Sequence, residues 1–144
     1  MKRFTGISLF FIAVFLIACK STVTKQPTVG VVGQNVSVDG GSYTDVSVAE
    51  LKTMLANKDF TFINVHIPFD GNIAKTDKSI PYDQIGQNLD KLPSDKNAKI
   101  VLYCRSGHMS AIAAKTLVGL GYSNIWNLTG GMIAWEQTGL PIDR

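Results

Sequence analysis

The chain has 144 residues, of which 45% are hydrophobic and 17% are charged, a composition typical of one globular domain. Its formal net charge of +3 falls to +1 when Lys2 and Arg3 are removed with the first eighteen residues. The sequence contains no basic cluster and no interleaving of basic and aromatic residues, so its charge excludes nucleic acid as an expected partner.

The N-terminus has the pattern of a secretory signal. Lys2 and Arg3 form a short basic region, and residues 9–18 form an almost unbroken apolar run that is too short to span a bilayer as a mature helix. Leu16-Ile17-Ala18-Cys19 resembles the processing box of bacterial lipoproteins. We therefore expect a signal peptide over 1–18, a lipid on Cys19 and an extracytoplasmic, membrane-anchored protein. The alternatives are a simple secreted protein and a buried N-terminal helix.

Residues 20–41 are rich in Ser, Thr, Val, Gly and Gln and have little periodicity. This composition predicts a flexible tether over 19–41, with an end-to-end distance of roughly 25 Å for about 20 residues. The folded domain is then expected over 42–144.

The domain is predicted to alternate helices and strands. Ser47 and Glu50 form a capping box, which predicts a helix over 47–57 with Val48, Leu51 and Met54 on its apolar face. Further segments are expected as a strand (59–66), a loop (68–81), a short helix (82–92), a strand (99–104), a helix (110–120), a strand (124–128) and a helix (132–137). This alternation indicates an α/β domain with a parallel sheet flanked by helices, in which ligands bind beyond the carboxyl ends of the strands.

Cys104 lies at that end of the sheet, between a buried strand and the beginning of a helix. A loop in this place directs backbone N–H groups and the positive end of a helix dipole at the sulfur, which favours a thiolate, a persulfide or a bound oxyanion. With Cys19 acylated, Cys104 is the only remaining thiol, so no intrachain disulfide can form. The two histidines and Cys104 do not have metal-ligand spacing, and we expect no metal.

These residues resemble the rhodanese-like sulfurtransferases over roughly 42–143. Tyr103-Cys104-Arg105-Ser106-Gly107 with Ser110 matches the family's active loop, and Asn127-Leu128-Thr-Gly130-Gly131-Met-Ile-Ala-Trp135 matches its closing strand and helix. Pro68, Asp70, Ile80-Pro81 and Asp83 fit the first half loosely. Cysteine phosphatases of related fold have an arginine six residues after the cysteine, whereas this chain has Ser110 there, which disfavours phosphatase and arsenate-reductase chemistry.

The resemblance implies a rhodanese-like fold and a two-step transfer through a Cys104 persulfide. A donor such as thiosulfate gives its sulfane sulfur to Cys104, and a thiol or cyanide then accepts it, without metal or organic cofactor. The loop residues would bind the substrate and stabilise the anionic sulfur. They are Arg105, Ser106, Gly107, His108, Met109 and Ser110.

Several positions depart from the family pattern. Met109 stands where many members have an arginine that binds the donor, Asn64-Val65-His66 replaces Asp-x-Arg, and Gly71-Asn72-Ile73 replaces Gly-His-Ile. Fast thiosulfate turnover is therefore less expected than the thiol chemistry itself. Arg105 and His108 could instead be surface residues, and His66 is interpreted as structural. The whole domain could also be a non-catalytic binding or sulfur-carrier module, or a thiol redox sensor.

Overall fold

The structure, a computed structural model, describes residues 30–144. The predicted signal peptide and the predicted lipid site, Cys19, lie outside the described residues. No helix within 30–144 is long and apolar enough to cross a membrane.

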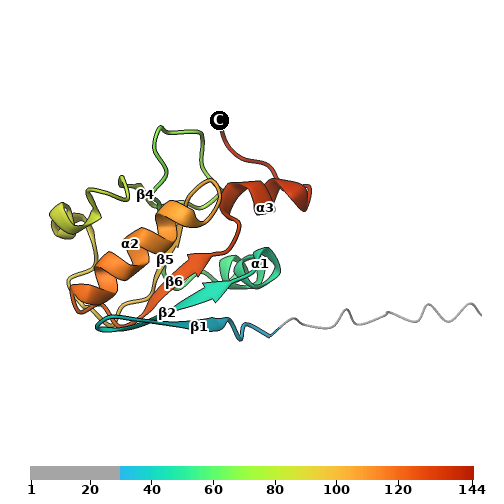
Figure 1. Ribbon diagram of the computed structural model, residues 1–144. Coiled ribbons are helices and arrows are strands. Elements are labelled where there is room, and N and C mark those ends of the chain that lie inside the picture. Colours follow the sequence, from blue (N-terminus) through green and yellow to red (C-terminus); the bar gives the residue numbers. More distant parts are fainter. Residues whose placement is uncertain (1–29) are drawn as a thin grey trace, which may run out of the picture.

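Within residues 30–144, six strands form one sheet in the order β1-β2-β6-β5-β3-β4 (Figure 1). The strands are β1 (Gln34–Val38), β2 (Gly41–Val46), β3 (Thr61–Asn64), β4 (Lys78–Ser79), β5 (Ile100–Tyr103) and β6 (Ile125–Leu128). The helices are α1 (Val48–Ala56), α2 (His108–Gly119) and α3 (Gly131–Gln137), with short 3-10 turns η1 (Ile85–Gln87) and η2 (Leu89–Lys91). β1 is antiparallel to β2, and all the other pairs are parallel. The predicted α/β fold is confirmed, and the sheet is parallel except for the antiparallel edge strand β1.

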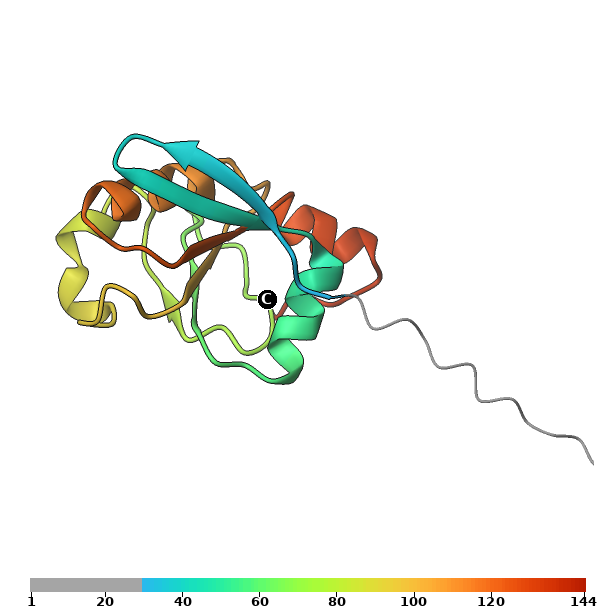
Figure 2. The same cartoon turned by 90° about the horizontal axis from the view of Figure 1, so that it is seen from below.

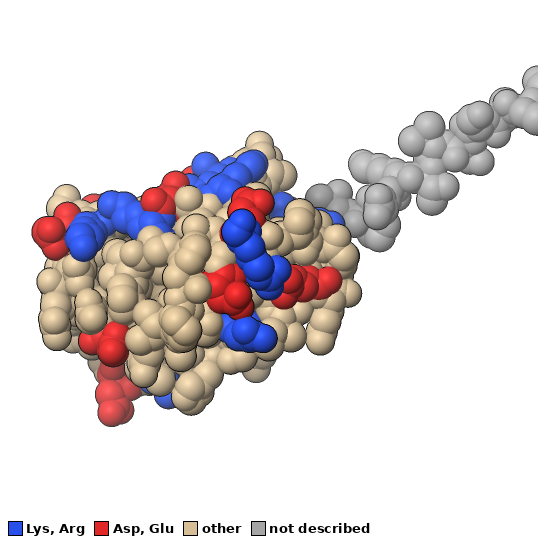
Figure 3. All heavy atoms as spheres, turned by 90° about the horizontal axis from the view of Figure 1, so that it is seen from above, with Lys and Arg blue, Asp and Glu red and all other residues tan. Residues whose placement is uncertain are grey.

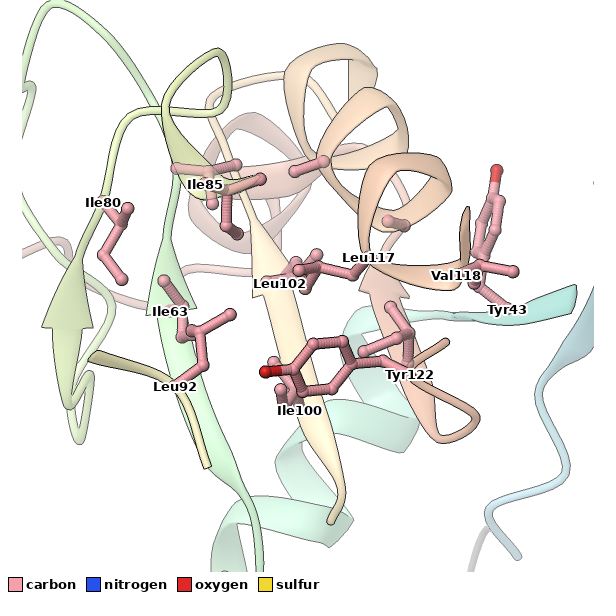
Figure 4. Packing of buried hydrophobic residues seen from close by; sticks show 14 of the residues in the cluster. Tyr43, Ile63, Ile80, Ile85, Leu92, Ile100, Leu102, Leu117, Val118 and Tyr122 are labelled. Atoms are coloured by element: carbon pink, nitrogen blue, oxygen red, sulfur yellow. The ribbon is translucent and has the colours of Figure 1, made fainter. Parts of the chain in front are cut away.

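Two cores cover the two faces of the sheet. Ile100 and Leu102 of β5 belong to the core beneath α2 (Figure 4). Val101 and Tyr103 belong to the core beneath α1 and α3. Successive side chains of a strand point to opposite faces. Cys104 continues this alternation and joins the core on the α2 side, which places the thiol at the beginning of α2.

The predicted capping box is present at the beginning of α1. The Ser47 hydroxyl accepts from the Glu50 backbone N–H at 3.3 Å, and the Glu50 carboxylate accepts from the Ser47 N–H at 2.9 Å. Glu50 also accepts from the N–H of Gly33 at 2.8 Å, so it ties the entering chain to the helix. These hydrogen bonds, led by the one from Ser47, lower the pKa of Glu50 from 4.5 to about 2 and keep the cap charged in mild acid.

The predicted tether over 19–41 is wrong in its last part. Gln34–Val38 is strand β1, and it pairs with β2 in the hairpin that forms one edge of the domain (Figure 2). The folded chain therefore begins before Ser42. Val36 and Val38 pack against the core while Asn35 and Ser37 are exposed, so this edge strand has the mixed polar composition of a linker.

Other predicted boundaries shift by small amounts, and one element differs in type. The short helix predicted over 82–92 is replaced by η1 and η2, separated by Asn88. Lys78–Ser79, within the predicted loop 68–81, pairs with β3 as a two-residue strand. The helix predicted over 110–120 begins earlier, at His108, with Gly107 as its N-cap residue.

Candidate active site

The Cys104 thiol lies at the bottom of the active loop, which comprises residues 104–110. The residue follows β5 directly and is 1% exposed. Its Sγ accepts a hydrogen bond from the backbone N–H of Gly107 at 3.1 Å, and the Ser110 hydroxyl lies 3.5 Å away. The same hydroxyl lies 3.1 Å from the carbonyl oxygen of Gly107, so its single proton is shared between two acceptors. An anionic sulfur would draw that proton to itself.

The backbone at Gly107 gives the loop its shape. This residue has φ +90° and directly precedes α2, a conformation that glycine adopts at little cost. A Cβ there would lie 3.1 Å from the backbone nitrogen of Gly130. The chain can therefore turn its N–H toward Sγ while it passes close to the next loop.

The N-terminus of α3 supports the loop from the other side. The backbone N–H groups of Met132 and Ile133 donate to the carbonyl oxygens of Cys104 and Arg105 at 2.9 and 3.0 Å. This approach requires Gly131, because a Cβ there would lie 2.7 Å from the Arg105 carbonyl oxygen. The Gly-Gly pair noted in the sequence thus holds the active loop in place.

Arg105 has a partner that the sequence did not reveal. Its Nη1 lies 2.9 Å from Oδ2 of Asp70, a residue in the loop after β3 and 35 positions away in the chain. The Arg105 side chain remains 59% exposed. Asp70 attracted notice only as part of a loose family pattern, and the sequence carries no local signal for the pair.

The side chains of the other predicted loop residues form no hydrogen bond to Sγ in the structure. Ser106 and His108 are exposed, and Met109 is half-buried and packs against the core on the α2 side. The contacts to Sγ given above come from Gly107 and Ser110. The substrate-binding roles of Arg105, Ser106, His108 and Met109 remain predictions.

His66 lies near the same charges. Its side chain is half-buried, and within residues 30–144 its Nδ1 has no hydrogen-bond partner. Burial lowers the pKa of His66, Asp70 opposes this shift and Arg105 adds to it. The ring is therefore neutral at neutral pH, beside Asp70 and Arg105.

Tyr103 anchors the loop that carries Asp70. Its hydroxyl accepts from the Ile73 N–H at 3.0 Å and lies 2.7 Å from the Thr76 hydroxyl and 3.2 Å from Oδ1 of Asn72. Burial raises the pKa of Tyr103, so the phenol stays protonated. The residue before the thiol therefore connects β5 to the rim of the site.

Within residues 30–144, no group of three His, Cys, Asp or Glu side chains is placed to hold a metal ion. The fold and the site together define an α/β domain with one buried cysteine in a loop between a parallel strand and a helix.

The rhodanese-like domain model matches residues 47–138, and the chain belongs to the rhodanese-like domain family. Among solved structures, a rhodanese-related protein from Thermoplasma volcanium is 30% identical, with a TM-score of 0.58, and the match covers 68% of this chain and 95% of that one. A rhodanese-like domain protein from Staphylococcus aureus is 31% identical, with a TM-score of 0.58 and coverages of 69% and 98%.

Two curated relatives match parts of the chain. A sulfurtransferase from Allochromatium vinosum is 41% identical over 63 residues, which covers 44% of this chain and 57% of that protein. The rhodanese-like domain-containing protein 15 of Arabidopsis thaliana is 29% identical over 102 residues, with coverages of 62% and 56%. The chain thus spans just over half the length of these two relatives.

Proposed function

We propose that the protein transfers sulfane sulfur from an anionic donor to a thiophilic acceptor through a persulfide on Cys104. The observation that carries this proposal is the hydrogen bonding of Sγ by the Gly107 N–H, with the Ser110 hydroxyl in reach. Donors in fixed positions stabilise negative charge on sulfur without reorganisation. These two groups would stabilise the Cys104 thiolate, whose charge lies on Sγ.

The two steps balance as follows with thiosulfate and cyanide. The Cys104 thiolate attacks the sulfane sulfur, an S–S bond to Cys104 forms, and sulfite leaves with the electron pair of the broken S–S bond. Cyanide then attacks the outer sulfur, and thiocyanate leaves as the Cys104 thiolate is restored. One nucleophile serves both halves, so ping-pong kinetics are expected.

Mass spectrometry tests the intermediate directly. Incubation of the purified protein with thiosulfate should add about 32 Da, one sulfur atom, to the activated nucleophile. Cyanide should remove this mass and release thiocyanate. An unmodified thiol after exposure to several sulfane donors would contradict the proposal and favour the binding module. Preferential oxidation of Cys104 by peroxide, measured as loss of its alkylation by iodoacetamide, would favour the redox sensor.

We further propose that Cys19 carries lipid and anchors the domain to a membrane outside the cytoplasm, on the basis of the apolar run 9–18 and the sequence Leu16–Cys19. Cells fed a fatty acid with an alkyne tag should label the wild-type protein and not Cys19→Ser. Cys104→Ser should be labelled like the wild type. Equal labelling of Cys19→Ser would refute the anchor.

A further inference from the structure

Four charged side chains alternate in sign across the rim of the active loop. Arg105 Nη1 lies 2.9 Å from Asp70 Oδ2, Asp70 Oδ1 lies 3.5 Å from Arg144 Nε, and Arg144 Nη2 lies 2.8 Å from Glu136 Oε1. The surface seen from above, on the side where Figure 1 marks the C-terminus, shows acidic and basic groups side by side (Figure 3). Asp70 therefore has one cation on each carboxylate oxygen.

The backbone holds Arg144 in this place. Asn72 and Asp143 exchange two N–H···O hydrogen bonds of 2.8 Å, in an isolated antiparallel bridge. Trp135 Nε1 donates to the carbonyl oxygen of Pro141 at 3.0 Å and ties the same segment to α3. The segment 141–144 is thus fixed beside the loop that carries Asp70.

Asp70 occupies the guanidinium of Arg105, the group that the family resemblance assigns to the donor. Arg105 is the only lysine or arginine in the active loop, because Met109 stands where a second cation is common in the family. Asp70 is already bound to it, so a donor oxyanion bound by Arg105 would have to displace this carboxylate. Exposed ion pairs are weak enough to exchange partners, and Arg105 and Arg144 are 59% and 51% exposed.

We propose that Asp70 and Arg144 are positioning residues that set the availability of Arg105 to an anionic sulfur donor. When the donor takes Arg105, Asp70 keeps Arg144 as its counter-ion, so its charge stays compensated. Without Arg144, Asp70 would have Arg105 as its nearest cation and would hold it more tightly. This inference rests on the proposed function. Because the donor has to replace the Asp70 carboxylate, the site would favour donors that carry more negative charge than one carboxylate.

Steady-state kinetics with thiosulfate and cyanide test the competition. Arg144→Gln should raise the KM for thiosulfate about two- to fivefold with little change in kcat, and Asp70→Asn should lower this KM by a similar factor. Arg144→Lys should restore most of the wild-type KM because a cation remains near Asp70. Lys99→Gln is the matched control and should leave KM unchanged. Lys99 also forms an ion pair, with Asp59, but it directly precedes β5 and so lies at the end of the strand opposite Cys104.

A double-mutant cycle separates competition from the simple loss of a nearby positive charge. If Asp70 transmits the effect, Arg144→Gln should change KM little in the Asp70→Asn background. An equal rise in KM in both backgrounds, or no rise in either, would overturn the inference.

A binding measurement keeps this test apart from the test of the transfer reaction. Sulfate that occupies Arg105 should slow the alkylation of Cys104 by iodoacetamide. The sulfate affinity read from this protection should be highest in Asp70→Asn, intermediate in the wild type and lowest in Arg144→Gln. This order requires no turnover. Absence of the persulfide with this order intact would refute the transfer reaction alone, whereas equal protection of all three proteins would refute the role of Asp70 and Arg144.

Discussion

Replacement of Cys104 by serine or alanine should lower thiosulfate:cyanide transfer by at least about 1000-fold. A serine hydroxyl is not ionised at neutral pH and cannot hold sulfane sulfur as a persulfide. The thiocyanate formed per minute measures the loss, and circular dichroism shows whether each variant is folded. Activity within tenfold of the wild type in a folded variant would contradict the proposed nucleophile.

Ser110→Ala is the matched control for the nucleophile. It removes the hydroxyl 3.5 Å from Sγ and leaves the Gly107 N–H in place. One lost hydrogen bond to a charged acceptor corresponds to a decrease of about ten- to a hundredfold, well below the loss expected for Cys104→Ser. A loss as large as that of Cys104→Ser would show that Ser110 does more than stabilise the sulfur.

The second large effect is expected at Gly131. In Gly131→Ala the new methyl group would meet the carbonyl oxygens of Cys104 and Arg105, and neither backbone atom can move without displacing the active loop. Overpacking and a positive φ of +56° should together lower the free energy of unfolding by about 3 kcal/mol. Urea denaturation measures this change, and the transfer rate should fall because α3 no longer holds the loop.

Gly139→Ala separates strain from overlap. Gly139 also has a positive φ, +79°, but a Cβ there meets nothing within 4 Å. Its unfolding free energy should fall only by the conformational part, about 1 to 2 kcal/mol. Equal destabilisation of the two variants would show that the close approach of α3 to the loop contributes nothing.

The parts of the structure that follow from short-range signals could be predicted from the sequence. Ser47 and Glu50 define the beginning of α1 through their own contacts, and the apolar run before Cys104 defines β5. The place of the thiol then follows from the rule that parallel strands present their carboxyl ends at one edge. The family resemblance rested on the same local motifs.

The missed features have different causes, and only the ion pairs of the rim depend on partners that are far apart in the chain. β1 pairs with β2 across the two-residue turn Asp39-Gly40, a local hairpin signal that the interpretation of this segment as a tether overlooked. The Arg105–Asp70 pair joins two loops, and Arg144 joins it from a third segment. Tyr82 to Leu92 has helical spacing, yet it forms two short 3-10 turns, with Ile85 buried in the core on the α2 side. The ion pairs cannot be read from neighbouring residues.

The near-complete burial of Cys104 limits which molecules can reach its sulfur. The sulfur of the resting protein is almost out of contact with solvent. A disulfide-type bond is about 2.05 Å long, so an attached sulfur atom can extend the reactive end of the side chain outward by about that distance. In the proposed transfer, the first step would therefore require a slender donor that can reach the buried thiol. In the second step the electrophilic sulfur would lie farther out, where a bulkier acceptor could reach it.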